Sequence, residues 1–352
     1  MRILLCLTSA ILLASCAGET VEPDASGERV GETVLTISSP SSIRRLVGNE
    51  HGVLAIEPSG AWTVIRPGGA RVRADVGVAC PWKPAADALP VESEAILLES
   101  RVVFVSSACG VWSYAHDGSD LVEVVKRTDD DTGKPVVTWG GGGGPAFQHF
   151  LTAAVHRDRL FVCLGPALGV ASASPPRVQI WSSALDGAAP RAKLATLDIV
   201  DCPRFVADDD ALYFTGNRIV RLDRATLAVS ELARAPDRTN HGGMTLTSQY
   251  VVWLADHYER RDVEIQRVAK RGGNVERVAG NTLLKELVSD GSRVLGAGER
   301  TDIVEVAGDS VRTLFDAKAT FPTFALSNGA LYWVRDGGVT ARDTELARVP
   351  LR

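Results

Sequence analysis

Three histidines and one aspartate are the residues of this sequence best suited to chemistry. His241 lies in the segment Asn-His-Gly-Gly, Asp256 and His257 are adjacent further on, and His149 follows shortly after a run of five glycines. Imidazole is the commonest metal ligand among side chains and a general base near neutral pH. If the fold brings these groups together, they could bind a metal or an anionic substrate. The alternative, which the sequence favours, is a set of loop histidines hydrogen-bonded to the backbone.

A second candidate region flanks the glycine run 140–144. No Gly-Lys-Ser/Thr follows the glycines, so the run is not a phosphate-binding loop. Trp139 precedes it, and an aromatic side chain on a surface loop could stack on a sugar ring or an apolar ligand. Trp139 and His149 are therefore ligand-binding candidates. The Asp208–Asp210 run lacks the spacing of a calcium loop, and we predict no metal and no cofactor.

The elements that would position these residues are short, repeated β-strands. The segment Ala211–Arg234 reads as three strands joined by tight turns, with apolar and charged residues alternating at the period of a half-buried strand. An apolar run typical of its first strand recurs along the chain at intervals of 37 to 58 residues. The copies start at Val53, Val102, Leu160, Leu212, Val251, Val294 and Leu331. Repeats of about 40 to 50 residues are typical of propeller blades.

The sequence therefore predicts an all-β protein, a β-propeller of seven four-stranded blades, with six or eight blades as alternatives. The segment 33–38 could close the ring beside the last blade. The pattern resembles the divergent propellers of bacterial envelope proteins, including relatives of the YWTD and NHL classes. A β-sandwich or two smaller β domains remain open. In a propeller, the links between blades and the turns between second and third strands share one face, which would hold His149, His241, Asp256 and His257.

The first residues indicate export. Arg2 precedes a short apolar stretch, which is typical of a signal peptide and too short to span a bilayer. Leu13-Ala14-Ser15-Cys16 resembles the lipobox of bacterial lipoproteins, in which the chain is cut before the cysteine and the thiol carries a diacylglycerol. The resemblance implies a lipid anchor on Cys16, and Ala17 after it implies the outer membrane of the cell envelope rather than the inner one. An ordinary secretory signal is the alternative.

These observations divide the chain into a signal peptide at 1–15, a flexible tether at 16–32 and the propeller at 33–352. Four cysteines remain in the propeller, Cys80, Cys109, Cys163 and Cys202. Exported proteins commonly form disulfides, and proximity along the chain predicts the pairs Cys80–Cys109 and Cys163–Cys202. A zinc site built from the four thiolates is the alternative, although the paired C-x-x-C spacing is missing.

Composition restricts the partners. The formal net charge is −5 with no basic stripe, which gives no case for nucleic acid. We therefore expect a protein anchored to the membrane through Cys16, whose propeller is a binding scaffold for a protein, peptide or glycan. The alternative is a hydrolase or polysaccharide lyase with its site near His241 and His257. The sequence favours the scaffold, because no catalytic motif is visible.

Overall fold

The structure of the protein is a computed structural model. The structure describes residues 31–38, 43–75, 94–106, 110–125, 137–139, 145–147, 149–157, 159–166, 178–185, 192–198, 205–235, 239–257, 262–298, 302–317, 323–336 and 343–351. The side chains of 38, 106, 110, 125, 137–139, 145–147, 149–151, 164–166, 240, 281, 336 and 343 are outside this description.

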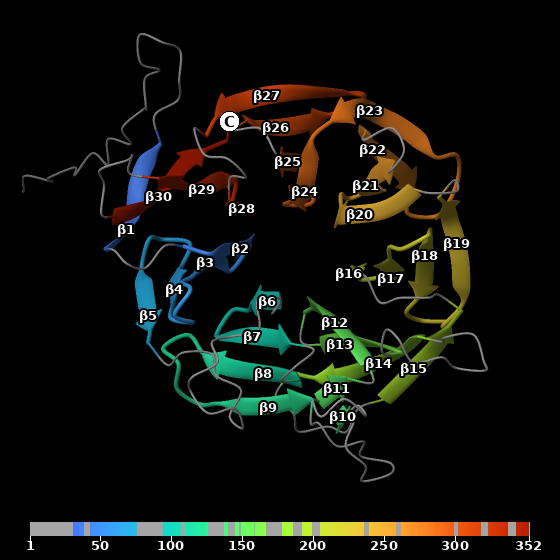
Figure 1. Cartoon of the computed structure of the whole chain (residues 1–352), viewed down its shortest axis with the longest axis horizontal. Coiled ribbons are helices and arrows are strands. Elements are labelled where there is room, and N and C mark those ends of the chain that lie inside the picture. The colour runs from blue at the N-terminus through green and yellow to red at the C-terminus, as the bar shows by residue number, and fades with distance from the viewer. Residues whose placement is uncertain are drawn as a thin grey trace, which may run out of the picture.

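The described residues form seven antiparallel sheets of four strands, arranged around a central axis as a seven-bladed β-propeller (Figure 1). This confirms the predicted fold and blade number. Blade 1 is β2 (Arg45–Asn49), β3 (Gly52–Ile56), β4 (Trp62–Ile65) and β5 (Arg71–Ala74). Blade 2 is β6 (Glu94–Leu97), β7 (Arg101–Ser106), β8 (Gly110–Ala115) and β9 (Val122–Val125). Blade 3 is β12 (His149–His156), β13 (Arg159–Pro166), β14 (Val178–Ala184) and β15 (Ala192–Leu197).

The remaining blades repeat this order from the innermost strand outward. Blade 4 is β16 (Phe205–Ala207), β17 (Ala211–Phe214), β18 (Arg218–Asp223) and β19 (Val229–Arg234). Blade 5 is β20 (Thr239–Leu246), β21 (Tyr250–His257), β22 (Asp262–Ala269) and β23 (Glu276–Thr282). Blade 6 is β24 (Leu284–Ser289), β25 (Val294–Gly298), β26 (Asp302–Ala307) and β27 (Ser310–Asp316). Blade 7 is β28 (Phe324–Ser327), β29 (Ala330–Asp336), β30 (Asp343–Pro350) and β1 (Glu32–Ser38).

The ring is closed by β1, the first strand of the chain. It pairs antiparallel with β30, from Glu32 opposite Arg348 to Ser38 opposite Asp343. This is the closure that the sequence predicted for 33–38. It joins the two ends of the described chain in one sheet and covers the edge of β30 that would otherwise be open.

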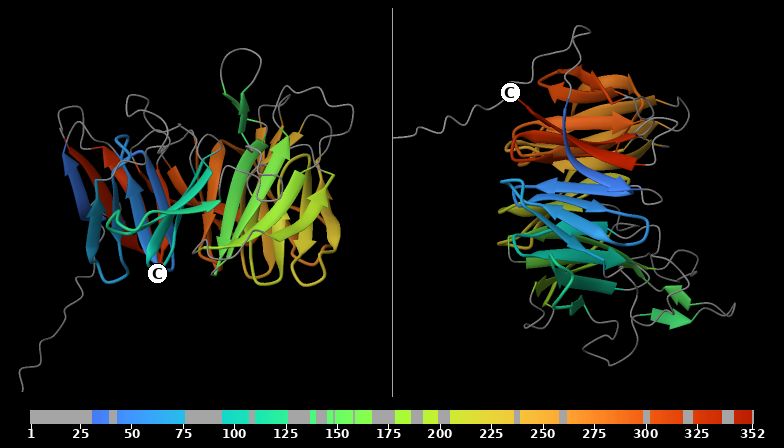
Figure 2. Two further views of the ribbon diagram at one scale, coloured as in Figure 1. Left: turned by 90° about the horizontal axis from the view of Figure 1, so that it is seen from below. Right: turned by 90° about the vertical axis from the view of Figure 1, so that its left-hand side faces the viewer.

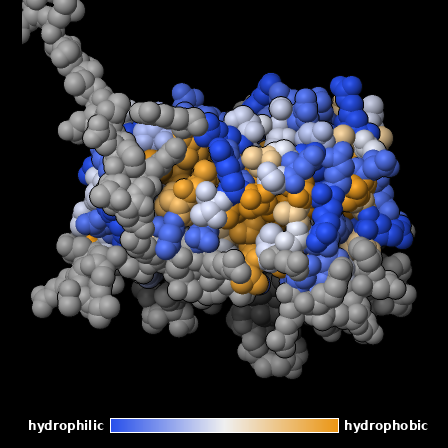
Figure 3. All heavy atoms as spheres, turned by 90° about the horizontal axis from the view of Figure 1, so that it is seen from above, coloured by the Kyte–Doolittle hydropathy of each residue, from blue (hydrophilic) through white to orange (hydrophobic). Residues whose placement is uncertain are grey.

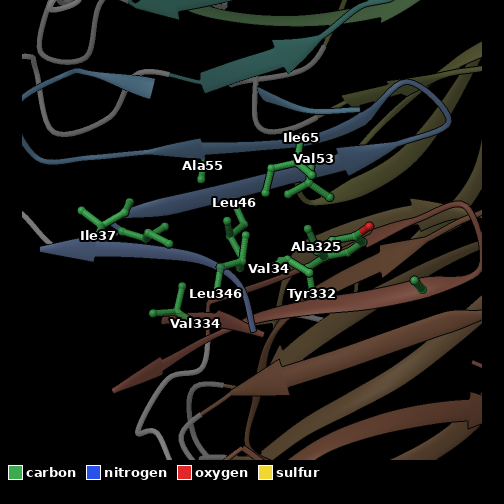
Figure 4. Close-up of a cluster of buried hydrophobic side chains, with 12 residues drawn as sticks. Val34, Ile37, Leu46, Val53, Ala55, Ile65, Ala325, Tyr332, Val334 and Leu346 are labelled. Carbon is green, nitrogen blue, oxygen red and sulfur yellow. The ribbon is translucent and has the colours of Figure 1, made fainter. Parts of the chain in front are cut away.

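The core is divided into seven clusters of buried apolar side chains, one between each pair of neighbouring blades. Figure 4 shows the cluster between blades 7 and 1, to which β1 contributes Val34 and Ile37 and blade 1 contributes Leu46 and Val53. Because each sheet packs on both faces, the second strands are apolar without alternation, and every residue of β3 and β17 is buried. On the side view of Figure 3, an apolar band runs among hydrophilic residues at the ring's outer surface.

The connections define two faces of the ring. We call top the face with the links between blades and the turns between second and third strands, and bottom the face with the other turns. A hairpin of β10 (Val137–Trp139) and β11 (Pro145–Phe147) belongs to the link between blades 2 and 3. Figure 2 shows it standing off the ring on the opposite side from the point marked C.

Candidate functional site

The predicted histidine site lies at the top of blade 5, on the surface that faces blade 4. His241 is the third residue of β20, inside the innermost strand rather than in the link where the sequence analysis located it. It pairs with Ala255, and its backbone N–H approaches the carbonyl of Gly216 in blade 4 at 3.3 Å. Its ring lies 5.5 Å from the ring of Trp253, and both side chains are buried. His241 is therefore part of the contact between two blades.

His257 occupies the end of β21 and lies in a polar network across three strands. Its Nδ1 is 3.0 Å from the hydroxyl of Thr239 on β20. Its Nε2 is 3.3 Å from Oε2 of Glu264 on β22. In the neutral tautomer protonated on Nε2, the Thr239 hydroxyl donates to Nδ1, and Nε2 faces the carboxylate at ion-pair distance, without the geometry of a hydrogen bond. The three groups form a hydroxyl–imidazole–carboxylate chain, in which the charge of the carboxylate can orient the imidazole.

Glu264 is held in place from two further sides. Nε2 of Gln266 donates to Glu264 Oε2 at 2.9 Å, and Nε of Arg277 lies 3.2 Å from Oε1. Burial opposes ionisation of this carboxyl, but the hydrogen bond from Gln266, the contact with His257 and the charge of Arg277 outweigh it. They hold the pKa of Glu264 below its usual value. The carboxylate is therefore charged at neutral pH and can orient His257.

His241 differs from His257 in having no acidic partner. Burial, with a smaller contribution from the nearby His257, lowers the pKa of His241 to about 4. Its Nδ1 and the indole Nε1 of Trp253 are both buried without a hydrogen-bond partner among the described residues. His241 is thus neutral at physiological pH, and only 2% of it is exposed. It is poorly placed to touch a substrate.

The other predicted residues are not brought into this network. Asp256 is next to His257, but successive residues of a strand point to opposite faces, so Asp256 is directed toward blade 6. His149 begins β12 at the top of blade 3, opposite Pro166, and Trp139 belongs to the separate hairpin. The structure therefore groups His241 with His257 and leaves Asp256, His149 and Trp139 apart.

Thr239 and Glu264 are the residues that the sequence reading missed. Thr239 lies directly opposite His257, and Glu264 lies opposite Ala255, whose side chain shares the face of His257. The register between the strands would have identified both residues. Assigning that register requires the exact ends of the strands, which the sequence pattern does not give. Within the described part of the chain, no group of three or more His, Cys, Asp or Glu could hold a metal ion.

Cys163 is buried in the middle of β13 and is disulfide-bonded. Cys80, Cys109 and Cys202 lie outside the described residues, as does Cys16, so the predicted pairs stay predictions. The described residues include no helix with the length and hydrophobicity that a membrane crossing requires.

The bottom mouth of the central channel holds a cavity of about 1260 Å³. It is lined by inner strands and turns of blades 1, 2, 3, 4 and 6, including His51 and His156. His156 Nε2 is 2.8 Å from Asp209, and Arg101 forms an ion pair with Asp120. Its charged groups are thus largely paired with one another.

No family model matches the chain. No curated protein matches its sequence with significance. Among solved structures, it is similar to an oligogalacturonate lyase in complex with manganese, with a TM-score of 0.60 and 8% identity over 91% of this chain and 98% of that one. An oligogalacturonate lyase from Vibrio parahaemolyticus has a TM-score of 0.60 and 8% identity, over 93% of this chain and 95% of that one. The extracellular domain of a putative one-component system from B. thetaiotaomicron has a TM-score of 0.55 and 12% identity, over 91% of this chain and 40% of that one. At these identities the likeness concerns the propeller fold alone.

Proposed function

We propose that the chain is a lipid-anchored protein of the bacterial cell envelope, held in the outer membrane through Cys16. Its propeller is a rigid scaffold that binds a protein, peptide or glycan on the top face. The tether 16–32 connects the anchor to β1. A closed β ring holds its loops in fixed positions at little cost in entropy, which suits recognition.

One observation supports this proposal above the others: the chain enters the ring on the face opposite its long connections. Glu32 pairs with Arg348, near the end of β30, and the last residue of β30 pairs with Ala330 beside a bottom turn. The described strand ends that border 76–93, 126–148 and 167–177 all lie at the top face. An anchor joined to the bottom would present these connections away from the membrane.

The test is to compare the wild-type chain with Cys16→Ala in membrane fractions of the producing bacterium. Wild type should float with the outer membrane, and the variant should be recovered in the soluble envelope fraction. Ser15→Thr is a control for changes near the cleavage position that keep the thiol. Equal membrane association of wild type and Cys16→Ala would reject the anchor.

The hydroxyl–imidazole–carboxylate chain favours a second candidate, a hydrolase or polysaccharide lyase. His257 would be the general base, oriented by Glu264, with the Thr239 hydroxyl beside it. In a lyase, the base removes the proton on the carbon next to a uronate carboxylate. The electron pair left behind forms a C=C bond to the neighbouring carbon, whose bond to the glycosidic oxygen breaks, and that oxygen takes up a proton. The oligogalacturonate lyases have the same fold, which makes oligogalacturonate a reasonable first substrate.

An activity assay separates the two candidates. The purified full chain is incubated with oligogalacturonate, with and without manganese, and with an activated acyl ester. The enzyme candidate predicts formation of the unsaturated uronate or hydrolysis of the ester, lost by at least about 100-fold in His257→Gln. His156→Gln, on the bottom face, is the matched control. Absence of turnover on both substrates, or turnover unaffected by His257→Gln, argues against this site.

A further inference from the structure

Three exposed apolar side chains lie in or beside bottom turns of the neighbouring blades 4 and 5. Leu227, Val229 and Val275 are 42%, 52% and 43% exposed. Leu227 and Val229 lie at the turn between β18 and β19, and Val275 lies before β23. A side chain built on Gly272 would come within 3.9 Å of Leu232, so the turn of blade 5 packs against β19. We call Leu227, Val229 and Val275 the rim patch.

Leu227 has an unusual backbone conformation for its residue type. Its φ is 57°, in the left-handed region, which costs a leucine free energy that glycine would not lose. The conformation is fixed by the turn, because Leu227 N–H donates to the carbonyl of Asp223 and the Asp223 carboxylate accepts from the N–H of Thr226. Leu227 keeps this strained conformation although its side chain is exposed and does not fill the core. We therefore look for a role of Leu227 at the surface.

The rim patch lies on the face where the chain enters the ring. β1 begins at Glu32 on the bottom, and residues 17–31 separate it from Cys16. Fully extended, this segment reaches at most about 50 Å. An anchored ring is therefore confined close to the bilayer, where weak apolar contacts are favoured by a high effective concentration. Arg271 is exposed in the same turn as Val275 and can reach a lipid phosphate.

We propose that the bottom face rests on the phospholipid surface, with the rim patch inserted at the level of the headgroups. This inference rests on the proposed lipid anchor and specifies the orientation of the ring. The partner is the bilayer itself: apolar side chains next to a cation are the combination that inserts at a membrane interface. The top face then points away from the membrane.

The test uses the full lipidated chain, extracted from membranes and reconstituted into vesicles of phosphatidylethanolamine and phosphatidylglycerol carrying brominated acyl chains. Val275→Trp reports on the rim patch, and Asn217→Trp, in a top-face turn of blade 4, is the matched control. The tryptophan fluorescence of the chain without the added tryptophan is subtracted from that of each variant. The inference predicts that the signal from Val275→Trp is quenched and that the signal from Asn217→Trp is not. Adding Leu227→Gly should weaken the quenching at Val275→Trp.

Flotation in the same preparation separates the two proposals. Protein that floats with the vesicles and shows quenching at Val275→Trp supports both. Protein that floats while Val275→Trp remains unquenched, or while Asn217→Trp is quenched equally, overturns the orientation and leaves the anchor standing. Protein that does not float overturns the anchor and the orientation with it. Because glycine relieves the strain at position 227, Leu227→Gly should remain folded.

Discussion

The imidazole of His241 lies against the indole of Trp253, with ring centroids 5.5 Å apart, at the contact between blades 4 and 5. Each ring has a buried nitrogen without a hydrogen-bond partner among the described residues. The two aromatic rings fill the space between the sheets of blades 4 and 5. Their burial disfavours a positive charge on the His241 imidazole. This arrangement makes the contact between the two blades sensitive to acid.

The first prediction concerns pH. The pKa of His241 is lowered to about 4, so below its usual value of 6.5 the unfolded chain binds a proton that the folded chain does not. Stability should therefore fall as the pH decreases from about 6.5 to 4, by on the order of 2–3 kcal/mol from this residue. The free energy of unfolding, measured by chemical denaturation across this pH range, should depend less steeply on pH in His241→Gln than in wild type.

His156→Gln is the control, since it removes a histidine from the bottom face and leaves the contact between blades 4 and 5 intact. It should retain the steeper dependence of the wild type. Identical pH profiles for His241→Gln and wild type would show that the acid sensitivity arises elsewhere.

The second prediction concerns the core between blades 1 and 2. Trp62 is fully buried, packs against Phe104 and Tyr114 at 5.3 and 5.4 Å, and donates from Nε1 to the carbonyl of His116. Trp62→Ala should reduce the free energy of unfolding by about 3–5 kcal/mol. Trp62→Phe, which keeps a ring, should cost roughly 1–3 kcal/mol through the carbonyl left unpaired. Similar losses in the two variants would contradict this division between packing and hydrogen bonding.

The third prediction concerns ring closure. Deleting residues 1–38 removes β1 and exposes the edge of β30, whereas deleting residues 1–30 leaves β1 in place. The longer deletion should lower the melting temperature and promote aggregation, since an open edge can pair with another chain. Val34→Ala offers a milder test of the same contact, because Val34 belongs to the core between blades 7 and 1. Equal melting temperatures for the two deletions would mean that β1 contributes little.

The fourth prediction uses the strained leucine. Leu227→Gly should raise the free energy of unfolding by about 1 kcal/mol, because glycine adopts a positive φ without steric cost. Asn328→Gly is the control: Asn328 also has a positive φ, of 49°, but asparagine tolerates it better, so the gain should be smaller. A loss of stability in Leu227→Gly would show that the leucine is held by contacts worth more than the strain.

The architecture could be predicted from the sequence because propeller blades repeat. The apolar runs at Val53, Leu212 and Val251 belong to strands buried on both faces, and their spacing alone gave seven blades. The closing strand could be predicted as well, since 33–38 is a β-favouring segment before the first blade and a closed ring leaves no open edge. Both features depend on local residue patterns, and a single sequence contains these patterns.

The candidate site could be predicted only in part, because it depends on register. A boundary error of a few residues placed His241 in a loop rather than in β20, and the sequence grouped Asp256 with the histidines. Alternation along a strand turns Asp256 away, and pairing between strands brings Glu264 to His257. The rim patch was also missed, since the turn conformation at Leu227 follows from hydrogen bonds that no apolar pattern predicts.

The intact mass of the chain extracted from membranes decides whether a lipid holds the propeller to the envelope. We expect a mature protein that begins at Cys16 and carries a diacylglycerol on its thiol. A protein with an unmodified Cys16, or one cut at another position, would contradict it.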